Sequence, residues 1–95
     1  MEQHVRDQAD WGLAAAAQSG ARGLAVYETA MQILCDRQGY EADAADYARE
    51  CGDETEQLRH AYWAAVYSRA KFVVAKAERG YIGDVLELTA KLLQV

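Results

Sequence analysis

Residues 53–80, "DETEQLRHAYWAAVYSRAKFVVAKAERG", predict the longest helix of the chain. Asp53 stands three residues before Glu56, the spacing of a capping box, which satisfies the first backbone N–H groups of a helix. Gly80 stands where a glycine often follows a helix C-terminus. Between these ends, apolar residues recur at helical spacing and predict one inward face: Trp63, Val66, Ala70, Val73, Val74 and Ala77.

Glycines divide the rest of the chain into segments of helical length, and proline is absent from all 95 residues. Apolar spacing predicts further helices over residues 3–18, 22–38, 41–50 and 83–94. The inward positions predicted for helix 3–18 are Val5, Ala9, Leu13 and Ala16. Those for helix 22–38 are Leu24, Tyr27, Met31 and Leu34, and Val26, Ala30 and Ile33 widen this face. Those for helix 41–50 are Ala44, Tyr47, Ala48 and Cys51. We therefore expect one all-α domain, residues 1–95, as a compact bundle of four to five helices around one long central helix.

The composition is that of a folded, acidic, globular protein. Apolar residues make up 52% and charged residues 26% of the chain, and the net charge is −5. The first ten residues lack the pattern of a signal peptide, and no apolar run is long enough to cross a membrane, so we expect a cytoplasmic protein without membrane contact. Cys35 and Cys51 stand at apolar helical positions, which predicts buried free thiols.

Residues 47–63 contain the skeleton of a helix-turn-helix, with Ala48, Gly52 and Leu58 at the required spacing. The second helix of such a motif would lay its first turn in the major groove, where Lys and Arg contact phosphates. Here that turn reads "DETE", and residues 41–56 carry seven acidic side chains against Arg49. We therefore do not expect this segment to bind nucleic acid directly.

The same acidic side chains form the densest one-sign cluster of the chain, which we call the acidic ridge: Asp43, Asp46, Glu50, Asp53 and Glu54. The first three share a helix face at i, i+3 and i+7. The ridge is suited to a basic surface on a protein partner, and the competing interpretation is that it only keeps the protein soluble.

A second candidate surface, the basic surface, lies further along the long helix and consists of Arg69, Phe72, Lys76 and Arg79. An aromatic ring among cations is typical of a protein-binding hot spot or of a nucleic-acid contact. In the alternative interpretation Phe72 packs on a neighbouring helix and the cations extend around it into solvent.

Catalytic and metal-binding patterns are weak. His4 falls at a helix end expected to fray and His60 on the polar side of the long helix, and neither has a nucleophile beside it. A carboxylate site combining the ridge with Glu56 and His60 would need the Glu-x-x-His spacing of di-metal bundles, which is missing. We expect no enzyme activity, no catalytic residues, no cofactor and no metal.

Two functional classes remain. The first is a protein-binding module that inhibits or regulates a partner, as immunity proteins, antitoxins and phage anti-host proteins of similar size and charge do; this is an analogy only. The second is a dimeric nucleic-acid-associated regulator with a degenerate helix-turn-helix, and a structural subunit ranks third. We also expect a homodimer, formed by the last helix and the broad face of helix 22–38, because Leu86, Leu88, Leu92, Leu93 and Val95 crowd the end of the chain.

Overall fold

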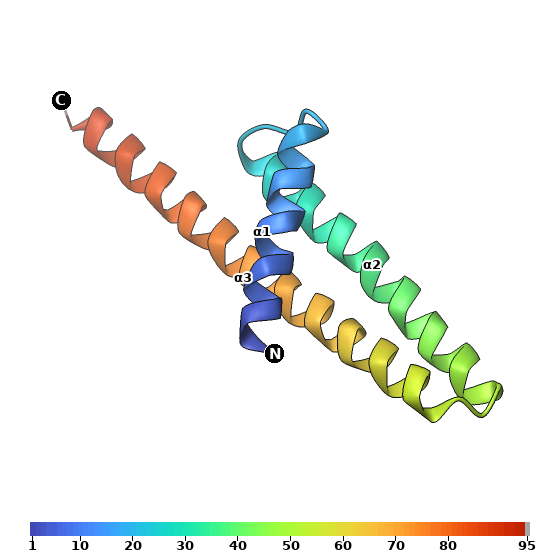
Figure 1. Cartoon of the computed structure of the whole chain (residues 1–95). Helices are drawn as coiled ribbons and strands as arrows, with labels where there is room; N and C mark the ends of the chain where they lie inside the picture. Colours follow the sequence, from blue (N-terminus) through green and yellow to red (C-terminus); the bar gives the residue numbers. More distant parts are fainter. Residues whose placement is uncertain (95) are drawn as a thin grey trace.

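The computed structural model describes residues 1–94, and Val95, which the predicted dimer surface includes, lies outside them. The chain forms three helices, α1 (Glu2–Gln18), α2 (Leu24–Glu50) and α3 (Glu54–Leu93), with no strand among the described residues (Figure 1). The all-α prediction is confirmed, whereas the prediction of four to five helices is wrong.

The error arises from glycines that do not end helices. Gly39 lies inside α2, so the predicted helices 22–38 and 41–50 are one helix, and Gly80 and Gly83 lie inside α3, which continues to Leu93. Glycine costs about 1 kcal/mol relative to alanine in a helix interior, which a long helix tolerates. The loops instead use Gly20, Gly23 and Gly52 at φ values of 98°, 59° and 73°, a region that other residues rarely adopt.

The predicted start of the long helix is confirmed at Asp53. The carboxylate of Asp53 accepts a hydrogen bond from the backbone N–H of Glu56 at 3.1 Å, which satisfies one of the free donors of the first turn. The Glu56 side chain contacts Arg59 at 3.0 Å and His60 at 3.3 Å, so it serves ion pairs in the first turns of α3.

The helices pack as an antiparallel hairpin crossed by a third helix. α2 runs beside the first half of α3, and α1 lies across both, while the C-terminal part of α3 projects alone from the bundle (Figure 1). The molecule is correspondingly elongated, with extents of 66 × 24 × 17 Å, so the prediction of a compact bundle is wrong.

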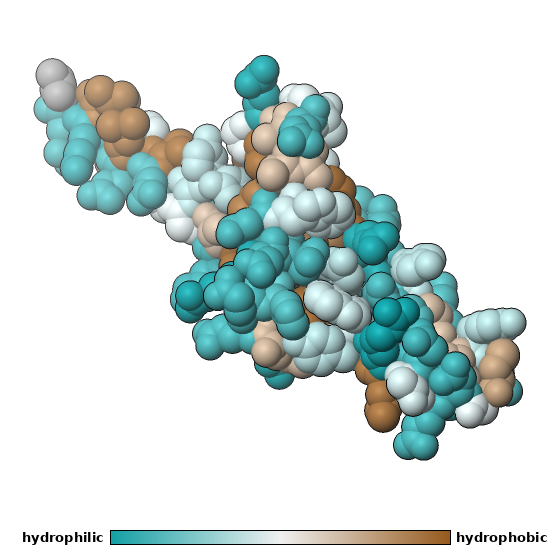
Figure 2. All heavy atoms as spheres, in the orientation of Figure 1, coloured by the Kyte–Doolittle hydropathy of each residue, from teal (hydrophilic) through white to brown (hydrophobic). Residues whose placement is uncertain are grey.

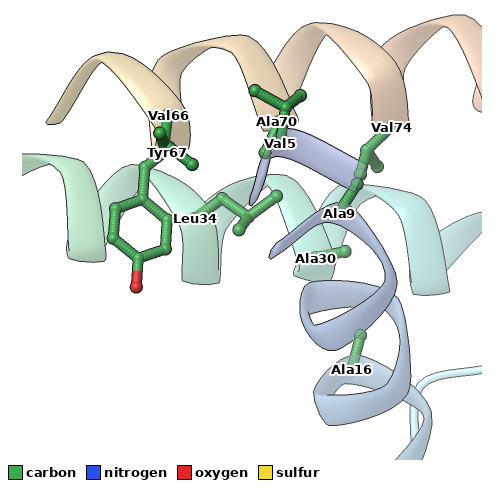
Figure 3. Close-up of a cluster of buried hydrophobic side chains, with 9 residues drawn as sticks. All are labelled: Val5, Ala9, Ala16, Ala30, Leu34, Val66, Tyr67, Ala70 and Val74. Atoms are coloured by element: carbon green, nitrogen blue, oxygen red, sulfur yellow. The ribbon is translucent and has the colours of Figure 1, made fainter. Parts of the chain in front are cut away.

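The core is thin and lies where the three helices meet. Leu34 of α2 is fully buried between α1 and α3, as Figure 3 shows. Gly12 of α1 faces it so closely that an added Cβ would lie 3.0 Å from Leu34 Cγ. Most of the other core side chains are small, which lets the helices approach: Val5, Ala9, Ala16, Ala30, Val66, Tyr67, Ala70 and Val74.

The predicted inward face of the long helix is too wide. Val66, Ala70 and Val74 are buried as expected, and Trp63 is half-buried, but Val73 is 43% exposed and Ala77 is exposed. The reason is that α1 and α2 cover one side of α3 and stop before its end.

Four further inward assignments are also wrong. Leu24, Tyr47, Cys35 and Cys51 are exposed, and both cysteines are free thiols. By contrast, Val5, Ala9 and Ala16 of α1 are buried as predicted.

Replacing Val66 by Asp should abolish cooperative unfolding, because an unpaired buried carboxylate costs several kcal/mol against a total stability of about 5–10 kcal/mol. The matched variant Val73→Asp places the same charge at an exposed position and should change the free energy of unfolding by less than about 1 kcal/mol. Urea denaturation followed by circular dichroism compares the two. An equal decrease in the free energy of unfolding in both variants would contradict the assignment of Val66 to the buried face of α3 and of Val73 to its exposed face.

Replacing Gly12 by Ala should lower the free energy of unfolding by about 1–3 kcal/mol, because the new methyl group collides with Leu34 and separates α1 from α2. Gly39→Ala is the control, since an added Cβ at Gly39 meets nothing within 4 Å and alanine favours the helix. Thermal melting should show opposite shifts, down for Gly12→Ala and up for Gly39→Ala.

Candidate functional site

The most conspicuous surface is the projecting end of α3, residues 81–93, which we call the terminal segment. Every one of these residues is exposed, although half of them are large and apolar. Exposure reaches 65% at Leu86 and 82% at Leu93. The apolar side chains are Tyr81, Ile82, Val85, Leu86, Leu88, Leu92 and Leu93.

These side chains share one face. At 3.6 residues per turn they cover an arc of about 160°, together with Thr89. Asp84, Glu87 and Lys91 occupy the remaining side, where Glu87 and Lys91 form an ion pair at 3.4 Å. Figure 2 shows hydrophobic atoms along one side of the projecting end and hydrophilic atoms along the other. The terminal segment is therefore an amphipathic helix, and beyond its base the described chain does not cover its apolar face.

The base of the terminal segment touches the start of α2. The rings of Tyr81 and Tyr27 lie 5.4 Å apart between centroids. Beside this contact is a shallow hollow of about 360 Å³, lined by Leu24, Tyr81, Ile82, Val85 and Leu86. The hollow is open and apolar, so it is shaped to receive further apolar side chains.

The other half of the predicted dimer surface is not available. Ala30 and Leu34 of α2 are buried in the core, and most of the rest of its broad face packs against that core: Val26, Tyr27, Met31 and Ile33. Leu24 is the exception, because it is exposed and lines the hollow. This face is used inside the chain, because α2 contacts both α1 and α3. Of the two faces predicted for assembly, the one on the terminal segment of α3 remains exposed.

The acidic ridge gathers at the opposite end of the molecule, around the turn between α2 and α3. All five of its carboxylates are exposed, as predicted. Asp46 pairs with Arg49 at 3.6 Å, and Asp53 caps α3. Asp43, Glu50 and Glu54 therefore contribute charge, whereas Asp53 also holds the helix start.

The basic surface is exposed and more extensive than the sequence predicts. Arg69 and Lys76 line an open groove of about 540 Å³ together with Val73 and, from α1, Val5, Arg6 and Glu2. Phe72 is 72% exposed, so the interpretation in which it packs on a neighbouring helix is wrong. Arg79 is also exposed.

The predicted helix-turn-helix skeleton has a different geometry. α2 and α3 run antiparallel around Gly52 (Figure 1), whereas the two helices of a helix-turn-helix meet at about 90–120°. Leu58 is 63% exposed instead of lying between the helices. Residues 47–63 therefore form the closed end of a helical hairpin.

Glu41 and His60 form a polar pair near the ridge that the sequence does not predict. Glu41 is buried, and its Oε2 lies 2.6 Å from Nδ1 of His60, whose Nε2 lies 3.3 Å from Glu56. The prediction that His60 stays on the polar side of its helix is wrong. One sequence signal does exist: Leu34, Glu41 and Ala48 recur every seven residues, and all three are buried.

The same pair borders a pocket of about 210 Å³ that also contains Arg37 and Tyr67. The hydrogen bond with Tyr67 raises the pKa of Arg37. Across the molecule, His4 is not frayed, because its Nδ1 lies 2.6 Å from the Tyr62 hydroxyl and its ring lies against Trp63. These polar contacts bind helix to helix.

Within residues 1–94, no group of three or more His, Cys, Asp or Glu side chains is arranged to hold a metal ion. Over the same residues, no helix has the length and apolar character needed to cross a membrane. No known protein family, curated protein or solved structure matches the chain.

Replacing Glu41 by Ala should lower the free energy of unfolding by about 2 kcal/mol, because His60 loses its buried partner between α2 and α3. Asp43→Ala removes a carboxylate two residues away at an exposed position and should change stability by less than about 0.5 kcal/mol. Urea denaturation measures the free energy of unfolding of both variants. Equal stability of the two would show that the pair contributes nothing.

Proposed function

We propose that this chain is a small acidic helical protein-binding module that regulates a protein partner. The observation that carries the proposal is the terminal segment, a helix with a wide apolar face that the described chain leaves in solvent. Monomeric proteins rarely expose contiguous apolar patches of this kind, and such patches commonly mark protein contacts. Amphipathic helices bind proteins by laying the apolar face in a groove or against another helix.

The terminal segment would also support the homodimer expected from the sequence. A second copy of the chain carries the same apolar face, and association of the two copies would cover apolar residues that are now exposed to solvent. In this form of the proposal the last helix alone makes the contact, because the broad face of α2 is occupied.

The acidic ridge supplies the second contact of the proposed module. It lies at the start of α3, so the helix holds it about 60 Å from the far end of the terminal segment. Its exposed carboxylates are suited to steering a basic protein surface, as rim charges do, and leave the apolar face free.

A nucleic-acid-associated role is the second candidate. It is favoured by the exposed Phe72 beside Arg69 and Lys76, and by Arg6 of α1, which lines the same groove as these two cations. Cations around an exposed ring suit a nucleic-acid backbone and a stacked base. Glu2 in the same groove and the net charge of −5 weaken this candidate.

Reversing Asp43, Asp46 and Glu50 to Lys should slow association with the protein partner by about one to two orders of magnitude and flatten its salt dependence. The partner is first captured from the native host, and the captured material is then treated with nuclease. Association with the protein that remains bound is followed by surface plasmon resonance. The control reverses Asp7, Asp10 and Glu28, which gives the same net charge at exposed positions outside the ridge.

Unchanged kinetics in the ridge variant would leave the ridge with a solubilising role only. If the triple alanine variant of Arg69, Phe72 and Lys76 lost binding instead, and nuclease treatment released the captured material, the nucleic-acid candidate would replace the proposal.

A further inference from the structure

We infer that the terminal segments of two copies pair in antiparallel orientation, with Asp84 of each copy facing Lys91 of the other. This inference rests on the proposed function and names the occupant of the apolar face. Its support comes from three features of the segment: the spacing of its apolar residues, the position of its charges and the hollow at its base.

The apolar spacing is that of a helix pair. Tyr81, Val85, Leu88 and Leu92 follow each other at intervals of four, three and four residues, and all four are exposed. This is the repeat with which two helices interlock side chains along a common line, here called the seam. In an antiparallel pair centred between residues 86 and 87, Val85 lies beside Leu88 of the second copy, and Tyr81 lies beside its Leu92.

The charges beside the seam favour one orientation. Asp84 and Lys91 are seven residues apart and border the same edge of the seam, and Ile82 and Thr89 border the other edge. Antiparallel helices bring like edges together, so Asp84 meets Lys91 of the second copy, and twofold symmetry repeats the pair. Parallel helices bring unlike edges together and would place Asp84 beside Thr89. Only the antiparallel arrangement matches opposite charges.

The hollow fits the same register. It lies beside Tyr81 and Ile82 and is lined on its other side by Leu24. The centre that aligns the seam brings Leu92 and Leu93 of the second copy to this hollow, and these are among the most exposed leucines of the chain. Each copy thus offers an apolar hollow at one end of the segment and the leucines to fill it at the other. A surface with both parts is complementary to itself.

Charge reversal of the full-length chain tests the orientation, with the dimer dissociation constant measured by analytical ultracentrifugation at low salt. Asp84→Lys and Lys91→Asp each place like charges across the pair and should raise that constant about tenfold. The double variant Asp84→Lys/Lys91→Asp restores opposite charges and should return the constant to within about threefold of the original. Asp10→Lys is the control for Asp84→Lys, because it makes the same charge change at an exposed position of α1, outside the terminal segment, and should have little effect.

Each outcome decides the inference. Weakened single variants and a restored double variant support antiparallel pairing, whereas a double variant as weak as the single ones overturns it. A chain that stays monomeric at all concentrations up to the millimolar range also overturns it. In that case the proposed function survives if Leu88→Lys abolishes binding of the captured protein partner, and it fails if neither Leu88→Lys nor the ridge reversal changes that binding.

Discussion

The contact between Gly12 and Leu34 is the constraint on which the rest of the structure depends. A single fully buried leucine separates α1 from the α2–α3 hairpin, and the absence of a side chain at Gly12 allows the approach. The surrounding core is mostly alanine and valine, so the helices lie close together and bury little volume. Such a core is compact but short, and the long axis of α3 extends well past it.

The difference in length between this core and α3 determines which apolar side chains are exposed. The last fully buried residue of α3 is Val74. After the contact between Tyr81 and Tyr27, the helix continues to Leu93 with its side chains exposed. Its apolar side chains therefore face solvent, while the turn at the other end collects the carboxylates of the ridge. One end of the molecule exposes an apolar face because the two covering helices stop short of the length of the third, and the other end is acidic because the residues around the turn are carboxylates.

The sequence predicted what depends on local chemistry. The cap at Asp53, the buried positions Val66, Ala70 and Val74, and the solvated ridge all follow from spacing and hydrogen-bonding capacity in a single helix.

Prediction from the sequence failed where the conformation or burial of a residue depends on neighbouring helices. Gly39 and Gly80 look the same in sequence as Gly52, but only Gly52 adopts positive φ. Val73 is apolar like Val74, and its exposure is set by where α1 and α2 lie. Glu41 was assigned to no surface because its histidine partner is 19 residues away.

The continuity of α3 has a consequence for multivalent binding. One continuous helix sets the distance between the ridge and the terminal segment, so two copies joined at their terminal segments would hold their ridges about 100 Å apart. A target with two basic sites at that separation would gain avidity, because the second contact forms at a high effective concentration. A target with closer sites would be held by one ridge at a time. The length of α3 would then determine which targets are bound with avidity, according to the separation of their two basic sites.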